Sequence, residues 1–94
     1  MKVRQNAVGP KIRHLRYQQG LTQNELSARI GLLGWDISRA TLSQIEAQLR
    51  CVTDFELVCI AKALRVSADD ILPAPSHVKK MLAEFFPEMP VEKE

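Results

Sequence analysis

Apolar residues recur at helical spacing along most of this chain. Ile12 and Leu15 lie three residues apart behind Pro10, a residue that suits the first position of a helix, and Gly20 follows as a left-handed stop. The pattern therefore predicts a first helix over residues 10–19.

Capping residues predict where the next two helices begin. Thr22 and Glu25 form a capping box, in which each side chain accepts a hydrogen bond from the backbone N–H of the other residue. The second helix that follows buries Leu26 and Ile30, and Ser38 caps a third helix. The inward positions of the third helix are Leu42, Ile45 and Leu49.

Two more helices complete the expected fold. Thr53 and Glu56 repeat the capping-box pattern ahead of a fourth helix, and Ser67 opens a short fifth helix that must stop before Pro73. Five short helices with apolar inward sides predict a compact all-α domain over residues 8–72. The inward positions of the fourth helix are Leu57, Ile60, Ala61 and Leu64.

Residues 73–94 follow that domain as a Pro-rich spacer, a C-terminal amphipathic helix and a tail. Ser76 is the expected cap of this helix, whose apolar residues recur at i, i+3, i+4, i+7 and i+8. Such a stripe must be covered, either by its own domain or by a second copy of the chain. The candidates for a dimer contact are Val78, Met81, Leu82, Phe85 and Phe86.

The net charge of +2 matters less than its distribution. Residues 1–50 carry eight Lys or Arg side chains against three Asp or Glu, a balance of +5, whereas residues 51–94 carry five against eight, a balance of −3. A basic half is typical of a surface that faces an acidic partner such as nucleic acid, although solvated charge gives the same pattern.

Composition and the first residues of the chain argue against a membrane-spanning or secreted protein. The chain is 46% apolar and 26% charged, which is ordinary for a globular protein, and no run approaches the roughly 18 apolar residues of a membrane span. Its first residues are polar and basic and lack the apolar stretch of a signal peptide. We therefore expect a cytoplasmic protein with no membrane partner, in which Cys51 and Cys59 remain thiols.

Three blocks of the chain resemble a known family. "LTQNELSARIG", "ISRATLSQIEAQLR" and "LVCIAKALRVSADDIL" stand in the order found in phage-repressor helix-turn-helix domains, often called the Cro or XRE-like family. The resemblance extends from Lys11 to Leu72. It implies that the second helix lies across the DNA backbone and that the third, over residues 38–48, enters the major groove.

The resemblance also implies particular DNA contacts. Gln23 stands at the family's glutamine that begins the second helix and touches phosphate or base, with a merely solvated residue as the alternative. Gln44 matches a base-reading position whose amide can pair with adenine, and Arg39 can pair with guanine. Small residues on the same outward side let the helix approach the bases. The expected DNA-binding residues are Gln23, Ser38, Arg39, Ala40, Thr41, Ser43, Gln44 and Arg50.

Two further positions carry over from the family. Arg16 and Glu46 match a structural ion pair between the first helix and the end of the third. Arg50 stands where the family often places a phosphate contact, and an exposed loop arginine is the alternative.

The departure from the family is the stretch between the second and third helices, which is longer here by residues 32–36. We expect the second helix to continue for about a turn, so that Leu33 joins its buried row and Gly34 provides a left-handed stop. Trp35 and Ile37 then pack over the lengthened end. The alternative places the Trp35 indole N–H on a DNA phosphate.

Other chemistry is sparse. His14 and His77 lie far apart without neighbouring ligands at metal spacing, and no phosphate loop or nucleophile constellation is present. We expect no metal, no cofactor and no enzymatic activity. Cys51 lies next to Arg50, which leaves a redox switch open as an alternative use of its thiol.

The sequence therefore predicts a sequence-specific, double-stranded DNA-binding transcriptional repressor that acts as a homodimer. Pairing two domains on half-sites about 34 Å apart supplies the affinity and specificity that one domain lacks. The alternative is an XRE-like protein-interaction module or antitoxin-type adaptor that binds a partner protein. The small net charge and the long loop favour this alternative, whereas the small polar outward side of the third helix argues against it.

Overall fold

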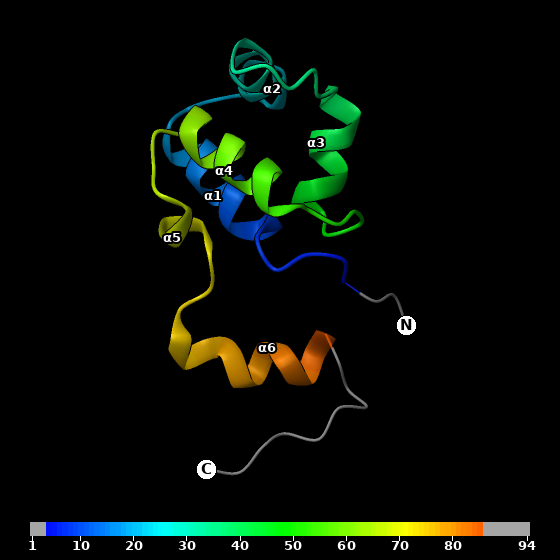
Figure 1. Cartoon of the computed structure of the whole chain (residues 1–94), viewed down its shortest axis with the longest axis vertical. Coiled ribbons are helices and arrows are strands. Elements are labelled where there is room, and N and C mark those ends of the chain that lie inside the picture. The colour runs from blue at the N-terminus through cyan, green and yellow to red at the C-terminus, as the bar shows by residue number, and fades with distance from the viewer. Residues whose placement is uncertain (1–3, 86–94) are drawn as a thin grey trace.

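The computed structural model describes residues 4–85, which form helices joined by short loops (Figure 1). No strand occurs within this range, and the prediction of a five-helix all-α domain followed by a C-terminal helix is confirmed. The helices are α1 (Gly9–Gln18), α2 (Gln23–Leu32), α3 (Arg39–Glu46), α4 (Asp54–Ala63), α5 (Ala68–Ile71), a 3-10 turn η1 (Pro75–His77) and α6 (Val78–Phe85).

One core lies between the first five helices. α3 packs on both α1 and α2, α2 packs on α4, and α4 packs on α5. The predicted inward residues of α2 and α3 are completely buried, with the two exceptions Leu33 and Leu49 discussed below. The buried apolar residues are Val8, Ile12, Leu15, Leu21, Leu26, Ile30, Ile37, Leu42, Ile45, Ile60, Ala61, Ala63, Leu64 and Ile71.

The predicted starts of α2, α3, α4 and α5 are confirmed. The Glu25 backbone N–H donates to the Thr22 hydroxyl at 3.0 Å, and the Thr22 N–H donates to the Glu25 carboxylate at 2.9 Å. The same box forms ahead of α4 and, with Asp70 as the reciprocal partner, at the start of α5. These caps depend only on residues three apart, so the sequence shows them directly.

The prediction that Leu49 lies inward is wrong. α3 ends at Glu46, and the chain then leaves it through Gln48, whose φ of +64° is left-handed. The Gln48 N–H donates to the Ile45 carbonyl at 3.0 Å and the Leu49 N–H to the Gln44 carbonyl at 2.8 Å, the two bonds of a Schellman motif. This turn directs Leu49 outward, where it is 52% exposed.

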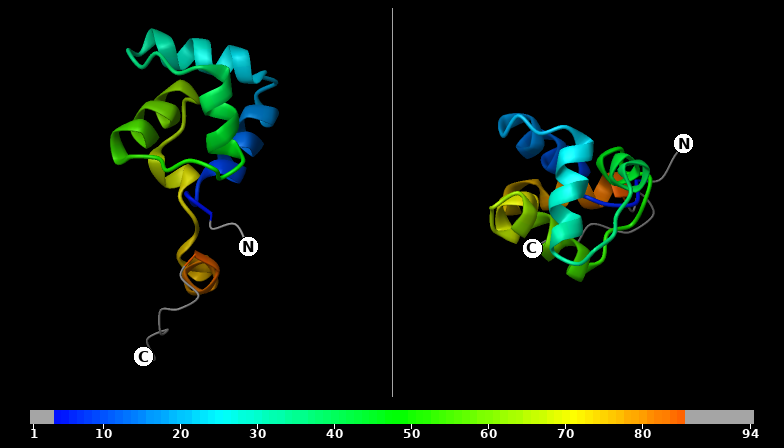
Figure 2. Two further views of the ribbon diagram at one scale, coloured as in Figure 1. Left: turned by 90° about the vertical axis from the view of Figure 1, so that its right-hand side faces the viewer. Right: turned by 90° about the horizontal axis from the view of Figure 1, so that it is seen from above.

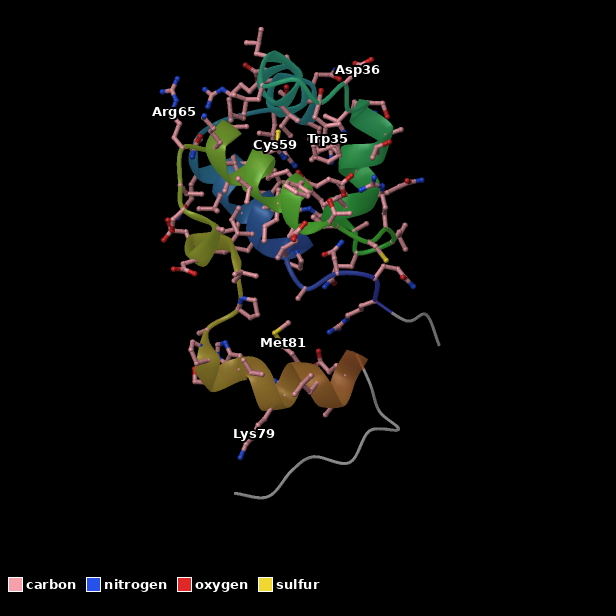
Figure 3. The ribbon with its side chains drawn as sticks, viewed as in Figure 1. Trp35, Asp36, Cys59, Arg65, Lys79 and Met81 are labelled. Atoms are coloured by element: carbon pink, nitrogen blue, oxygen red, sulfur yellow. The ribbon has the colours of Figure 1, made fainter. Side chains whose placement is uncertain are left out.

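The loop after α2 agrees only partly with expectation. α2 ends at Leu32, and Leu33 is exposed at its C-terminal cap, so the prediction that Leu33 joins the buried row is wrong. Gly34 has the expected left-handed conformation, with φ of +109°. Ile37 is buried, and Trp35 is half-buried against the core, toward which its side chain points (Figure 3). The core position of Trp35 matches the packing interpretation.

The C-terminal helix lies apart from the five-helix domain (Figures 1 and 2). Ser76 does not cap α6, because it lies inside the 3-10 turn that precedes this helix. Met81 points toward the rest of the domain and Lys79 points away (Figure 3). Val78 and Leu82 remain 41% and 43% exposed. Phe86 and the predicted tail lie outside the described residues.

Candidate nucleic-acid interface

The candidate interface is built around the outward side of α3. Ser38 begins this helix, because its hydroxyl accepts a hydrogen bond from the Thr41 backbone N–H at 3.0 Å. On the opposite side, Leu42 and Ile45 anchor the helix in the core. α3 consequently turns one fixed side toward solvent. Arg39, Ala40, Gln44 and Ala47 are exposed there, while Thr41 and Ser43 are half-buried.

The outward side of α3 carries short side chains between two long polar ones. Arg39 occupies the first helical position, and Gln44 follows five residues later. Both side chains end in planar groups that can make paired hydrogen bonds to base edges. The small residues between them leave the helix backbone open to close approach.

A buried carboxylate fixes the opposite end of α3. Glu46 is only 1% exposed. Its oxygens accept hydrogen bonds from Arg16 Nε at 2.7 Å and from Arg16 Nη2 at 2.9 Å. Arg13 Nε at 3.4 Å and Gln23 Nε2 at 3.2 Å complete the set of donors. The structure thus contains the Arg16–Glu46 pair that the family resemblance implies, as a bidentate contact that ties α1 to α3.

The protonation of Glu46 reflects this setting. Burial raises the pKa of its carboxyl, but the hydrogen bonds from Arg16, Gln23 and Arg13 outweigh that effect. The pKa therefore lies below the ordinary value of 4.5, and the carboxylate stays charged at neutral pH. The end of α3 is held by a charge-assisted network.

Gln23 lies at the first position of α2, where it links this network to the surface. It is half-buried and donates to Glu46, so the alternative of a merely solvated residue is wrong. A hollow of about 360 Å³ opens beside it, between the start of α2 and the start of α3. The residues that line this hollow are Arg16, Tyr17, Thr22, Gln23, Asn24 and Arg39.

The hollow has the electrostatics of an anion site. Two arginines border it, and the positive end of the α2 dipole opens into it. Arg16 is buried and neutralised by Glu46, so Arg39 supplies the exposed charge. An anion at this point would lie between the start of α2 and the start of α3.

Arg50 has a different environment from the one expected. Its guanidinium makes two hydrogen bonds to the Glu56 carboxylate, at 3.0 and 2.9 Å, and lies 5.9 Å from the centre of the Trp35 ring. The hydrogen bonds from Arg50 lower the pKa of the Glu56 carboxyl. Arg50 is therefore no free loop arginine, because it joins the end of α3 to the start of α4.

Sequence reasoning missed two residues that hold α3 in place. Asn6 is buried and hydrogen-bonded on both sides of its amide, and Gly9 packs directly against the end of α3. An asparagine placed three residues before a glycine at a helix start is typical of an Asx-type turn, which is the signal that could have identified Asn6.

Two kinds of site, a metal cluster and a membrane span, are absent from the described residues. Within residues 4–85, no group of His, Cys, Asp or Glu side chains is arranged to hold a metal ion. No helix in that range is long and apolar enough to cross a bilayer. Cys51 is exposed and Cys59 half-buried, and both are free thiols.

The geometry described above belongs to a known class. A family model described as Helix-turn-helix matches residues 12–71, which is more than half of the chain. The chain belongs to this family, in its XRE type, and is a DNA-binding regulator of that kind. No curated protein and no solved structure matches the chain significantly.

Proposed function

We propose that this chain is a transcriptional repressor that reads double-stranded DNA in a sequence-specific way, with α3 in the major groove. The observation that carries the proposal is the outward side of α3. It exposes Arg39 and Gln44 among small residues and carries no acidic side chain, whereas its other side is rigidly anchored. A DNA-binding surface is sufficient for repression, because a protein bound to a promoter prevents the polymerase from binding there.

Phosphate contacts complete the proposed docking. Gln23 and Asn24 lie at the positive end of α2 and, with Arg39, border the hollow described above. Gln23 keeps an amide oxygen and a second amide hydrogen beyond its bond to Glu46. Arg50 is already bound by Glu56, so we assign it to holding the loop after α3 and expect at most a secondary phosphate contact.

The experiment that tests sequence reading is selection of bound duplexes from a randomised library at physiological salt. We expect an enriched inverted repeat. Arg39→Ala and Gln44→Ala should each weaken binding to it by about 1–3 kcal/mol and relax the preference at one position. Lys62→Ala, on the exposed side of α4, is the matched control and should change neither. The absence of any enriched sequence would contradict the proposal.

We further propose that two copies bind this repeat as a homodimer through α6. The half-exposed Val78 and Leu82 need a cover, and a two-fold contact between the α6 helices supplies one. The double variant Val78→Asp with Leu82→Asp should halve the particle mass in light scattering. Lys79→Asp, which points away from the domain, is the control with unchanged mass. An unchanged mass in the double variant would exclude α6 as the contact.

One observation favours a second candidate function, the binding of a partner protein. Leu32 at the end of α2 and Phe55 on α4 are 88% and 85% exposed, and the two helices pack on each other. The end of α2 and the start of α4 lie on the same side of the molecule (Figure 2). Exposed apolar residues of this size are typical of protein contacts.

The second candidate is tested separately from DNA reading. The double variant Leu32→Ser with Phe55→Ser should leave the selected DNA sequence unchanged and abolish retention of a partner from the cell extract. If wild-type protein and this variant retain the same proteins, the apolar residues do not form a partner site.

A further inference from the structure

The segment of residues 4–8 ahead of α1, here called the N-terminal arm, is joined to the far end of α3 by one buried side chain. The Asn6 Oδ1 atom accepts hydrogen bonds from the backbone N–H groups of Val8 at 3.1 Å and Gly9 at 2.8 Å. Its Nδ2 atom donates to the carbonyls of Ile45 at 3.0 Å and Arg50 at 2.8 Å. The start of α1 and the end of α3 thus share one amide group.

A second connection runs alongside the first. The Gln5 backbone N–H donates to the Gln48 carbonyl at 2.9 Å, and the Gln48 Nε2 atom donates to the Asn6 carbonyl at 3.0 Å. Gln48 holds the left-handed conformation that ends α3, which costs a residue with a side chain some free energy. The contact with the arm accounts for a glutamine at a position where glycine is usual.

Gly9, the first residue of α1 after the arm, determines how closely α1 and α3 approach. A Cβ atom on Gly9 would come within 2.3 Å of the Ile45 carbonyl oxygen, so only glycine fits there. Together with the Glu46 network, these contacts determine the position of the last turn of α3. The start of α3 is held separately, by the Ser38 cap and by the buried Ile37 and Leu42, so loss of the arm contacts should affect the last turn first.

We infer that Asn6, supported by Gln48, is a positioning residue for DNA reading. The inference rests on the proposed function of α3. An eight-residue helix is about 12 Å long, so a shift of 1 Å at its end tilts the outward side by about 5°. Hydrogen bonds to base edges tolerate little such tilt, whereas contacts with phosphate tolerate more. Loss of the arm contacts should therefore reduce discrimination between sequences before it reduces general DNA affinity.

Two variants test the inference. Asn6→Asp keeps the Oδ1 atom that accepts from the Val8 and Gly9 N–H groups and removes the Nδ2 atom that donates to the Ile45 and Arg50 carbonyls. Gln48→Gly removes the side-chain hydrogen bond to the Asn6 carbonyl, and glycine readily adopts the left-handed backbone of this position. This variant should stay folded, so it tests the inference even if Asn6→Asp does not fold. Arg65→Gly is the matched control, because Arg65 follows α4 with a similar left-handed φ of +58° and its N–H donates to the Lys62 carbonyl at the end of that helix.

The first measurement needs no DNA. Amide hydrogen exchange of residues 47–49 should become about tenfold faster in both variants, the effect of one lost buried hydrogen bond, while exchange at the end of α4 is unchanged. Arg65→Gly should leave residues 47–49 as in the wild type. Unchanged exchange at residues 47–49 in folded Gln48→Gly and Asn6→Asp overturns the inference.

The second measurement uses the sequence that wild-type protein selects and a scrambled duplex. The affinity of both variants for the selected duplex should fall about tenfold, the size of one lost base contact, with affinity for the scrambled duplex unchanged. A parallel loss on both duplexes means that Asn6 only stabilises the fold, which overturns the inference. Failure of the wild type to select any sequence is a failure of the proposed function, and it is seen before any variant is tested.

Discussion

The helices α3 and α6 have the same length and similar amphipathic patterns, but they have opposite environments. Leu42 and Ile45 of α3 are completely buried, whereas Val78 and Leu82 of α6 remain about two-fifths exposed. Each helix also carries a glutamate paired with an arginine from the N-terminal part of the chain. An apolar stripe therefore shows which side chains of a helix have to be shielded from water. It does not show whether the same domain or a second chain shields them.

The two ion pairs differ in the same way. The Arg16 and Glu46 side chains are 7% and 0% exposed, and the carboxylate has four donor atoms around it. The pair between Arg4 and Glu84 is open to water on both sides. A desolvated and fully bonded pair is costly to break from one side, while a solvated pair contributes little.

The largest expected effect comes from breaking the buried pair. Glu46→Ala should lower the free energy of unfolding by about 3–5 kcal/mol, because it leaves the buried Arg16 guanidinium without a countercharge, with only the Leu21 carbonyl to accept from it. Urea denaturation followed by circular dichroism measures this loss. Glu84→Ala on α6 is the control, and it should cost at most about 1 kcal/mol. Similar losses for the two variants would contradict the contrast between the helices.

The dependence of stability on pH should also distinguish the two ion pairs. The pKa of Glu46 is lower in the folded protein than its ordinary value of 4.5, so its contribution to stability is complete above that value. The contribution is lost as the pH falls below 4.5 and through the folded pKa. The stability difference between wild type and Glu46→Gln should therefore narrow as the pH falls below about 4.5.

The matched measurement for the pH prediction is the difference between wild type and Glu84→Gln. That difference should stay small over the same range, because the Arg4–Glu84 pair is solvent-exposed. Urea midpoints recorded at several pH values provide both differences. A constant difference for Glu46→Gln would mean that its carboxylate is not held in the charged form by the network.

Helix starts provide a smaller test. Ser38→Ala removes the cap of α3 and should cost about 1 kcal/mol. Ser76→Ala lies in the turn before α6, where the serine makes no cap, and should change stability by less than about 0.5 kcal/mol. Thermal unfolding of the two variants beside wild type measures both effects. A larger loss for Ser76→Ala would reverse the assignment of the caps.

The smallest effect is expected on the open side of α6. Leu82→Ser should change the stability of dilute protein by less than about 0.5 kcal/mol, because this side chain is already partly in water. Leu42→Ala, its counterpart on α3, should cost about 2–5 kcal/mol. A loss above about 2 kcal/mol for Leu82→Ser in dilute protein would mean that the chain covers α6 by itself.

How much the sequence predicted depended on the range of the interactions involved. Helix starts were predicted correctly wherever a capping residue meets a partner three positions later, as with Thr22 and Glu25. Helix ends were predicted less well. The apolar period continues through Leu33 and Leu49 and predicts that both are buried, but both helices stop before the period does.

In the candidate site, too, the features within one helix were predictable and the contacts between distant segments were not. The outward residues of α3, such as Arg39 and Gln44, follow from the positions of its buried leucine and isoleucine on a helical wheel. The bond from Gln23 to Glu46 and the pair between Arg50 and Glu56 do not follow from any local pattern. They require two segments to meet, and the sequence alone does not encode that meeting in a readable form.

The sequence by itself determined that this protein is a set of short capped helices, with one amphipathic helix aligned to present Arg39 and Gln44. Only the tertiary structure decided that Asn6, Gly9 and Glu46 hold the end of that helix, and that α6 stays away from the core. The physical reason is that caps and amphipathic periods arise within one turn. Buried polar contacts arise between segments about 30–45 residues apart in the chain, where only packing determines the partner.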